Sequence, residues 1–270
     1  MRGALAGLAV ALCGLVAGCG DDGASSPVAA AARPAPPPAA PASTGLSIAA
    51  AASLRELLEG TQAAFSAAHG GATWTVSFDA SSSLSRQIES GAPFDVFLSA
   101  DATNVDRLGD HIDGQSRRTF LTNRLALVGR ADLPAPLPAD PAALAGTRLT
   151  LALAGPAVPA GKYARAYLEA QGLLAALDPR VVTADSVKAA MALVEAGTAD
   201  CGIVYVTDAR SAKSAKLLWM APPGDDPGIA YVAARVRAST SPLADELLEW
   251  LGSAEFRAAA EGLGFGLPAQ

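Results

Sequence analysis

The chain has few cysteines and few aromatic residues, and each scarcity excludes a class of protein. Its three cysteines, Cys13, Cys19 and Cys201, are too few and too widely spaced for a disulfide framework or a zinc site. Aromatic residues make up 5% of the 270 residues although 51% are apolar, so small aliphatic side chains fill most of the core. Such a core favours an α/β fold over an aromatic-rich β-sandwich.

Clusters of positive charge are also missing. The formal net charge is −6, and no run of Lys or Arg interrupts the mixed distribution of charged residues. This pattern argues against nucleic acid as a partner. If the protein binds an anion, it must do so with local hydrogen-bond donors, because its long-range field does not attract one.

The first eighteen residues have the pattern of a signal peptide. Met1 and Arg2 precede an apolar run, residues 4–16, that is too short to span a bilayer. The sequence Leu-Val-Ala-Gly-Cys at residues 15–19 resembles a bacterial lipobox, which implies cleavage before Cys19 and a lipid on its thiol. The alternative is an ordinary secretory signal with an incidental cysteine. The Pro/Ala-rich remainder of residues 19–45 cannot form a core and is predicted to be a disordered tether.

From Leu46 onward, short apolar runs alternate with amphipathic segments, a pattern typical of βαβ units. The expected strands are residues 46–50, 74–78, 95–99, 125–128, 149–152, 181–182, 201–205 and 229–233. The expected helices are residues 54–68, 84–89, 163–171, 187–195, 242–252 and 254–261. We therefore expect two α/β lobes, residues 46–124 plus 229–270 and residues 125–228. Each should be a mostly parallel sheet flanked by helices, with a ligand cleft between the lobes.

Small or hydroxyl-bearing residues stand at four points where a strand gives way to a helix. They are Ser53, Ser81 with the serines after it, Ala160 and Val187. The unpaired N–H groups and aligned dipoles of helix N-termini bind anions without any Lys or Arg. The pattern therefore predicts a site for a small, deprotonated oxyanion. Ser53 and Glu56 also have the spacing of a capping box, which alone would explain the serine.

Several stretches together resemble the periplasmic molybdate-binding proteins of molybdate ABC importers. They are residues 50–54, 78–87, 88–101, 158–163, 189–197 and 202–209, in the family's order and near its spacing. The resemblance covers almost everything from Leu46 to the C-terminus. It implies the two-lobed periplasmic-binding-protein fold.

The resemblance also implies which groups hold the oxyanion, molybdate or the nearly equal-sized tungstate. They are the hydroxyls of Ser53, Ser81 and Tyr205 and the backbone amides of Ala160 and Val187. No catalytic residue, cofactor or direct metal ligand is implied, since molybdenum is held through its oxygens. A donor-only site of this kind should reject protonated oxyanions.

Asp79 departs from the family, which has small neutral residues before the second serine. A carboxylate near the site would repel a dianion but could accept the proton of hydrogen phosphate. Alternation along the strand favours an Asp79 side chain that turns away from the ligand. The choice of Ser81 over Ser82 is open by one residue.

The function expected from these observations is high-affinity molybdate binding and delivery to the permease of an ABC importer. The protein would be a monomer, periplasmic or at the cell surface, held to the membrane by its lipid and without a nucleic-acid partner. The alternatives are a receptor for sulfate or phosphate, a sensor domain, and a serine hydrolase using Ser53 or Ser81. The hydrolase is disfavoured because no Gly-x-Ser-x-Gly elbow exists and the two histidines, His69 and His111, fit surface positions.

Overall fold

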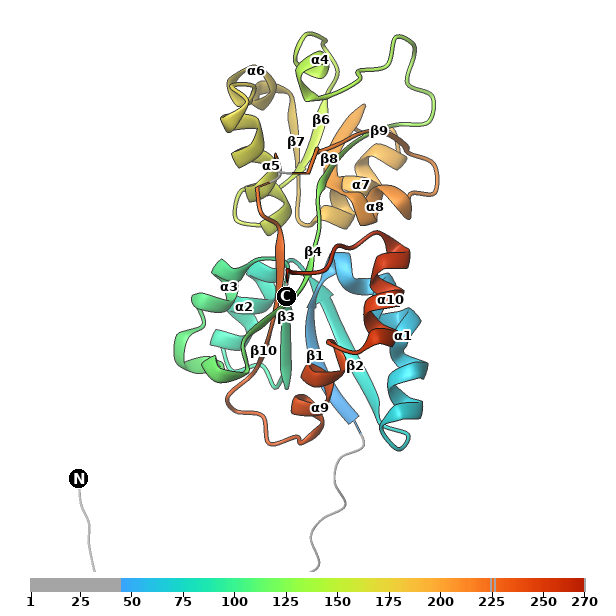
Figure 1. Ribbon diagram of the computed structural model, residues 1–270. Helices are drawn as coiled ribbons and strands as arrows, with labels where there is room; N and C mark the ends of the chain where they lie inside the picture. Colours follow the sequence, from blue (N-terminus) through green and yellow to red (C-terminus); the bar gives the residue numbers. More distant parts are fainter. Residues whose placement is uncertain (1–44, 224, 226, 270) are drawn as a thin grey trace, which may run out of the picture. The chain divides into compact units, whose positions relative to one another are not determined.

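The computed structural model describes residues 45–223, 225 and 227–269, and the signal peptide, Cys19 and most of the tether predicted above lie outside the described residues. Two five-stranded sheets, each flanked by helices, form two lobes (Figure 1). The predicted two-lobed α/β fold is therefore confirmed. Within the described ranges, no helix has the length and apolar character needed to cross a membrane.

The first sheet has the strand order β2-β1-β3-β10-β4. Its strands are β1 (Gly45–Ala51), β2 (Thr73–Asp79), β3 (Val96–Ser99), β4 (Arg118–Thr122) and β10 (Ala230–Arg235). The helices of this lobe are η1 (Ala52–Leu54), α1 (Arg55–Ala68), α2 (Ser81–Glu89), α3 (Ala102–Asp106), η2 (Gly109–His111), η3 (Gly114–Ser116), α9 (Leu243–Trp250) and α10 (Ala254–Leu263). Strand β1 pairs in parallel with β2 and β3, whereas β10 pairs antiparallel with β3 and β4.

The second sheet repeats this arrangement, with the order β7-β6-β8-β5-β9. Its strands are β5 (Leu125–Gly129), β6 (Leu151–Ala154), β7 (Val181–Ala184), β8 (Cys201–Tyr205) and β9 (Lys216–Met220). The helices of this lobe are α4 (Pro141–Ala145), α5 (Pro159–Ala170), α6 (Leu174–Leu177), η4 (Asp178–Arg180), α7 (Val187–Glu195) and α8 (Val206–Arg210). Strand β6 is parallel to β7 and β8, and β5 is antiparallel to β8 and β9.

The chain passes between the two sheets twice, from β4 into β5 and from β9 into β10 (Figure 1). A strand that returns from the other lobe enters its sheet at the cleft end. It must therefore run against β1, β2 and β3, which end at the cleft. For this reason both sheets are mixed, with one strand, β10 in the first and β5 in the second, running against the other four, and the predicted mostly parallel sheets are confirmed.

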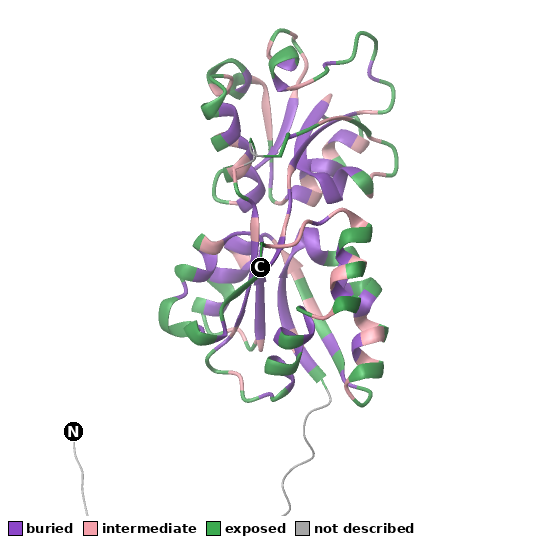
Figure 2. Cartoon of the chain, in the orientation of Figure 1, coloured by how far each residue is buried: buried purple, intermediate pink, exposed green. Residues whose placement is uncertain are grey.

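Small aliphatic residues let helices lie close against the inner strands of both sheets, which are buried along most of their length (Figure 2). Gly161, in the first turn of α5, is the clearest case. A Cβ atom there would collide with the backbone carbonyl oxygens of Ala154 and Gly155 at the end of β6. Glycine therefore allows the start of α5 to sit directly on the end of that strand.

Candidate anion-binding site

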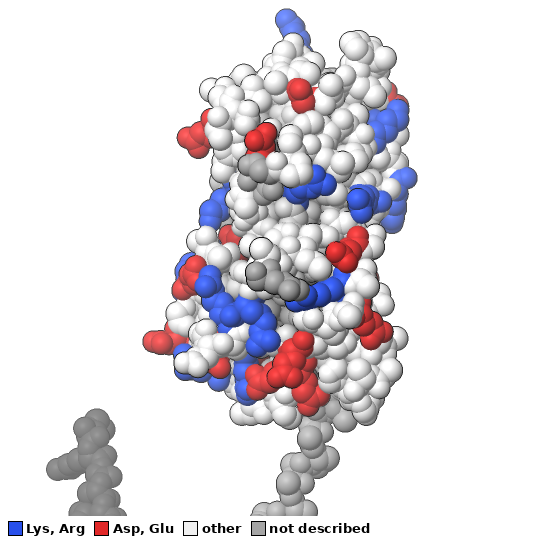
Figure 3. Space-filling view, in the orientation of Figure 1, with Lys and Arg blue, Asp and Glu red and all other residues white. Residues whose placement is uncertain are grey.

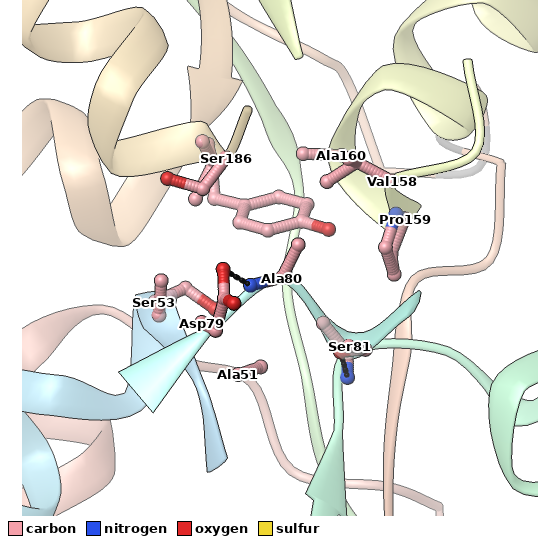
Figure 4. A pocket seen from close by; sticks show the side chains of 13 residues that line it. Ala51, Ser53, Asp79, Ala80, Ser81, Val158, Pro159, Ala160 and Ser186 are labelled. Carbon is pink, nitrogen blue, oxygen red and sulfur yellow. Dashed lines mark hydrogen bonds between the residues drawn. The ribbon is translucent and has the colours of Figure 1, made fainter. Parts of the chain in front are cut away.

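An enclosed pocket lies at the ends of strands from both sheets. Its lining comes from both lobes: Ala51, Ala52, Ser53, Asp79, Ala80, Ser81, Ala100, Val158, Pro159, Ala160, Ser186, Val187 and Tyr205 (Figure 4). All five residues predicted from the sequence to hold the oxyanion are in this set. Their role as ligands remains a prediction, but the fold brings them together from five separate segments.

Ser53 is not the helix cap that the spacing to Glu56 indicated. A short 3-10 turn, η1, is inserted after β1, so α1 begins at Arg55 and the Leu54 position before it makes no side-chain cap. The Ser53 Oγ instead lies 2.9 Å from the Oη of Tyr231 on β10. The capping-box interpretation is wrong because this extra turn displaces the start of the helix by one residue, from Leu54 to Arg55.

Tyr231 and Asn123 form a hydrogen-bonded chain that leads to Ser53. The Asn123 Oδ1 accepts the N–H of Arg124 at 2.9 Å, which fixes its amide so that Nδ2 donates to Tyr231 Oη at 3.3 Å. The second hydrogen of Nδ2 goes to the Thr207 Oγ1 at 3.0 Å. Because Tyr231 Oη already accepts from Asn123, its own proton can go to Ser53, which would leave the Ser53 proton for the pocket. Burial raises the pKa of Tyr231, so it stays a neutral donor.

The sequence did not single out Tyr231 or Asn123. A tyrosine inside a strand and an asparagine between two strands are common, and neither follows a helix-start pattern. Their connection to the pocket comes from the return of β10 into the first sheet, which sets Tyr231 beside Ser53. Only the strand order, read from the structure, could have indicated them.

Ser81 is the first residue of α2 and is 1% exposed. Its Oγ accepts the backbone N–H of Ala100 at 3.0 Å, so its own proton is available to a ligand. Ser82, by contrast, faces an outer groove and does not line the enclosed pocket. The geometry therefore favours Ser81 over its neighbour.

Two helix starts of the second lobe bring backbone amides to the pocket. Val158 precedes α5, with Pro159 and Ala160 as its first residues. Ser186 precedes α7, and its Oγ accepts the N–H of Ala189 at 3.1 Å. The amides of Ala160 and Val187 lie in the first turns of α5 and α7. N–H groups in the first turn of a helix have no acceptor within that helix. Both residues line the pocket, so both amides are suitable donors to an anion.

Tyr205 ends β8 and is 1% exposed. Its Oη is buried and makes no hydrogen bond to any described residue. Burial raises the pKa of this hydroxyl well above its usual value, so it carries a proton that it can donate. A buried polar group without a partner costs roughly 1–3 kcal/mol, so this hydroxyl indicates a ligand that completes it.

Asp79 also lines the pocket, contrary to the orientation favoured by strand alternation. Its Oδ1 accepts the N–H of Ala80 at 2.7 Å, and its carboxylate lies between Ser53 and Ala80 (Figure 4). Strand β2 ends at Asp79, directly opposite Ala51 of β1, and the chain turns there into α2. Alternation therefore no longer decides the direction of this side chain.

Lysines of the second lobe reach across the cleft on both flanks of the pocket. Lys188, next to Val187, places its Nζ 3.0 Å from Glu56 Oε1 of α1 and 3.1 Å from Oδ1 of the buried Asp208. Lys162, on α5, places its Nζ 2.7 Å from Thr103 Oγ1 and 3.6 Å from Asp101 Oδ2.

The Lys188 cluster is partly buried, which alters the acidity of its members. Burial raises the pKa of Asp208 to about 6, although Lys188 opposes the shift. For Lys188, burial lowers the pKa, but Asp208 and Glu56 outweigh it and the net shift is upward. The negative charge of Glu56, in the first turn of α1, is thus paired with a lysine of the facing lobe. No cluster of three or more potential metal ligands exists among the described residues.

Two lobes joined by two crossings, with hydrogen-bond donors converging on an enclosed pocket between them, define a ligand-binding protein of the solute-receptor class. The chain belongs to the family of bacterial extracellular solute-binding proteins, whose model matches residues 46–266. The molybdate-binding protein ModA of Escherichia coli (strain K12) is 36% identical over 184 residues, 65% of this chain and 71% of that protein.

Two further relatives extend the comparison over most of the chain. The molybdate-binding protein ModA of Haemophilus influenzae is 28% identical over 234 residues, covering 83% of this chain and 91% of that protein. The solved structure of the Azotobacter vinelandii periplasmic molybdate-binding protein has a TM-score of 0.73 at 26% identity, covering 83% of this chain and all of that one (100%). The resemblance seen in the sequence is thereby confirmed.

Proposed function

We propose that this protein binds molybdate, and tungstate with it, between its lobes and delivers the ion to the permease of an ABC importer. The observation that carries the proposal is the buried Tyr205 hydroxyl, which has no partner among the described residues and lines a pocket of converging donors. The names of the relatives supply the identity of the anion.

The donors act on the ion in a pocket lined mostly by buried residues. The hydroxyls of Ser53, Ser81 and Tyr205 and the amides of Ala160 and Val187 each point a proton at an anion oxygen. Hydrogen bonds to a charged group contribute roughly 1.5–3 kcal/mol each. After the losses from dehydrating the ion and closing the lobes, micromolar or tighter binding is a reasonable expectation.

Location and partners complete the proposal. The protein acts outside the cytoplasm, with a signal peptide at residues 1–18 and a lipid on Cys19. It works as a monomer whose closed form meets the permease, and it binds its ligand without chemical change. On the face drawn in Figure 3, acidic and basic side chains lie next to each other on both lobes. Such a mixed surface gives no support for a nucleic-acid partner.

Replacement of Tyr205 by phenylalanine tests the site. Calorimetric titration of the full chain with molybdate should show tight binding to one site. In Tyr205→Phe the affinity for molybdate should fall by about tenfold or more, because one hydrogen bond to an ion is removed. Tyr167→Phe is the matched control, because Tyr167 packs on Trp219 in the second lobe and does not line the pocket. Equal affinity of wild type and Tyr205→Phe would contradict the role of Tyr205.

A further inference from the structure

Of the residues that line the enclosed pocket, one is charged, and it is negative. Asp79 has its carboxylate in the pocket, where it accepts the Ala80 N–H at 2.7 Å. In the described ranges no cation is within ion-pair distance of it. Lys188 forms ion pairs with Glu56 and Asp208. The Nζ of Lys162 contacts Asp101 and donates to Thr103.

Asp79 stands at the boundary between the pocket and the outside. It lines both the enclosed pocket and an outer groove, whose walls are α2 and the loops that precede α5 and α7. The charged residues of that groove besides Asp79 are Arg86 and Asp185. Arg86 donates to the Ser83 Oγ at 3.2 Å, a hydrogen bond within its own helix, α2. An anion that fills the pocket therefore meets the Asp79 carboxylate directly.

The remaining polar groups of the pocket are arranged as donors. Ser81 accepts from the Ala100 N–H and has a proton left for the ligand, Ser53 can do the same when Tyr231 donates to it, and Tyr205 is protonated. A carboxylate offers only lone pairs, as does a fully deprotonated oxyanion, so the two share no hydrogen and repel. An oxyanion with one hydroxyl can donate that proton to the carboxylate in a short, charge-assisted hydrogen bond.

We propose that Asp79 is a specificity-determining residue, which makes this pocket prefer oxyanions that carry a hydroxyl, such as hydrogen phosphate, over fully deprotonated anions of the same size and charge, such as sulfate. The same carboxylate weakens the binding of molybdate. The inference rests on the proposed function to the extent that it assigns the anion to the same pocket. It adds a ligand class that a site made only of donors would reject.

The test compares two anions that differ by one hydroxyl. Sulfate and hydrogen phosphate are both tetrahedral dianions of similar size at mildly alkaline pH. Calorimetric titration of the full wild-type chain should give tighter binding of hydrogen phosphate than of sulfate by about tenfold, the scale of one charge-assisted hydrogen bond. In Asp79→Ala the order should reverse, and molybdate should bind at least about tenfold more tightly than in wild type.

Two further variants guard the interpretation. Asp79→Asn keeps an oxygen for the Ala80 N–H and nearly the same shape, so it tests the charge even if Asp79→Ala does not fold. It should also favour sulfate over hydrogen phosphate. Asp185→Ala removes one negative charge from the outer groove without touching the enclosed pocket, and should leave the order of the anions as in wild type.

The outcomes separate this inference from the proposed function. If wild type binds sulfate as tightly as hydrogen phosphate, or if both Asp79 variants keep the wild-type order, the inference is wrong while molybdate binding stands. If no variant binds molybdate but the preference between the smaller anions still follows Asp79, the proposed function fails and the inferred preference for hydroxyl-bearing oxyanions stands. Absence of binding of all three anions to every variant overturns both.

Discussion

Two neutral side chains outside the pocket lining, Tyr231 and Asn123, can orient the hydroxyl proton of Ser53. Asn123 has its amide fixed by Arg124 and donates to Tyr231, whose own proton can in turn go to Ser53. A serine hydroxyl alone can rotate and present either a donor or a lone pair. We expect this hydrogen-bonded chain to restrict that rotation, so that Ser53 faces an anion as a donor before the anion arrives.

Tyr231→Phe should therefore weaken molybdate binding without removing any group that touches the ion. The loss should be about two- to tenfold, the range expected for one neutral hydrogen bond. Calorimetry of the variant beside wild type and Tyr167→Phe measures it, with thermal unfolding recorded in parallel to separate affinity from stability. Affinity equal to that of wild type would show that Ser53 orients itself without Tyr231.

Asp208 gives a residue-level prediction about pH. Burial raises its pKa from 3.8 to about 6 beside Lys188 and Glu56. The folded protein therefore binds more protons at this site than the unfolded chain between these values. This preferential protonation adds to the free energy of unfolding. The contribution is fully present below pH 3.8 and is lost as the pH rises through about 6.

Relative to Asp208→Asn, the free energy of unfolding of wild type should consequently fall as the pH is raised from about 4 to about 6. Denaturant unfolding of both proteins across this range measures the difference. The Asn variant keeps an acceptor for the Tyr205 N–H, which Asp208 Oδ2 binds at 3.3 Å, so the start of α8 is preserved. A difference that does not change with pH would mean that Asp208 titrates near its ordinary value.

At the scale of elements, the helix and strand pattern could be predicted where hydrophobic periodicity decides it. Helix α7 and strand β8 have the bounds expected from the sequence, because each is bounded by clear start and stop signals. Strands β4 and β9 were not expected, since β4 begins with exposed Arg118 and Thr119 and β9 is an edge strand with exposed Lys216 and Leu217. Their pairing partners are distant in sequence, and no local pattern records that pairing.

The same distinction applies to the pocket. Ser53, Ser81, Ala160 and Val187 could be found because each stands at a strand-to-helix junction, a local signal. The turn η1 and the direction of the Asp79 side chain could not be predicted from the sequence. Both depend on how the chain leaves a strand, β1 for the turn and β2 for Asp79. Tyr231 could not be found because its neighbour Ser53 is 178 residues away.

Gly161 provides the element-scale prediction. Gly161→Ala should destabilise the protein by about 1–3 kcal/mol, because the new methyl group forces α5 away from the end of β6. Gly60→Ala is the control: Gly60 lies within α1, and a Cβ there meets nothing within 4 Å, so it should stabilise by about 0.5–1 kcal/mol. Urea unfolding of wild type and the two variants measures these changes. An unchanged free energy of unfolding in Gly161→Ala would show that α5 tolerates the shift. The molybdate affinity of Gly161→Ala should also fall, because a shift of α5 moves Ala160.

At the scale of the whole described fold, the lobes are held together by contacts other than the pocket. Lys188–Glu56 and the Lys162 contacts with Asp101 and Thr103 lie on two flanks of the cleft. The side chains of Lys188 and Glu56 are 29% and 42% exposed, so each contact contributes only about 0–1 kcal/mol in water. We expect them together to bias an equilibrium between open and closed lobes toward closure, which a bound anion would then complete.

Breaking both contacts should therefore open the unliganded protein. The double variant Glu56→Gln with Lys162→Met removes one charge of each sign, so the net charge and the long-range field are unchanged. Small-angle scattering should give a larger radius of gyration than wild type without ligand and the same radius with saturating molybdate. Molybdate affinity should fall by up to about tenfold, because a smaller fraction of the free protein is closed.

The matched control is Glu59→Gln with Lys216→Met, which makes the same charge changes without crossing the cleft. Glu59 pairs with Arg55 on its own helix at 3.2 Å, and Lys216 is an exposed residue of β9. This control should scatter and bind as wild type does. If both double variants scatter alike, the cross-cleft contacts do not govern closure, and the closed state then depends on the anion and the two crossings alone. Because exposed ion pairs are screened, added salt should also reduce the difference between wild type and the Glu56/Lys162 variant.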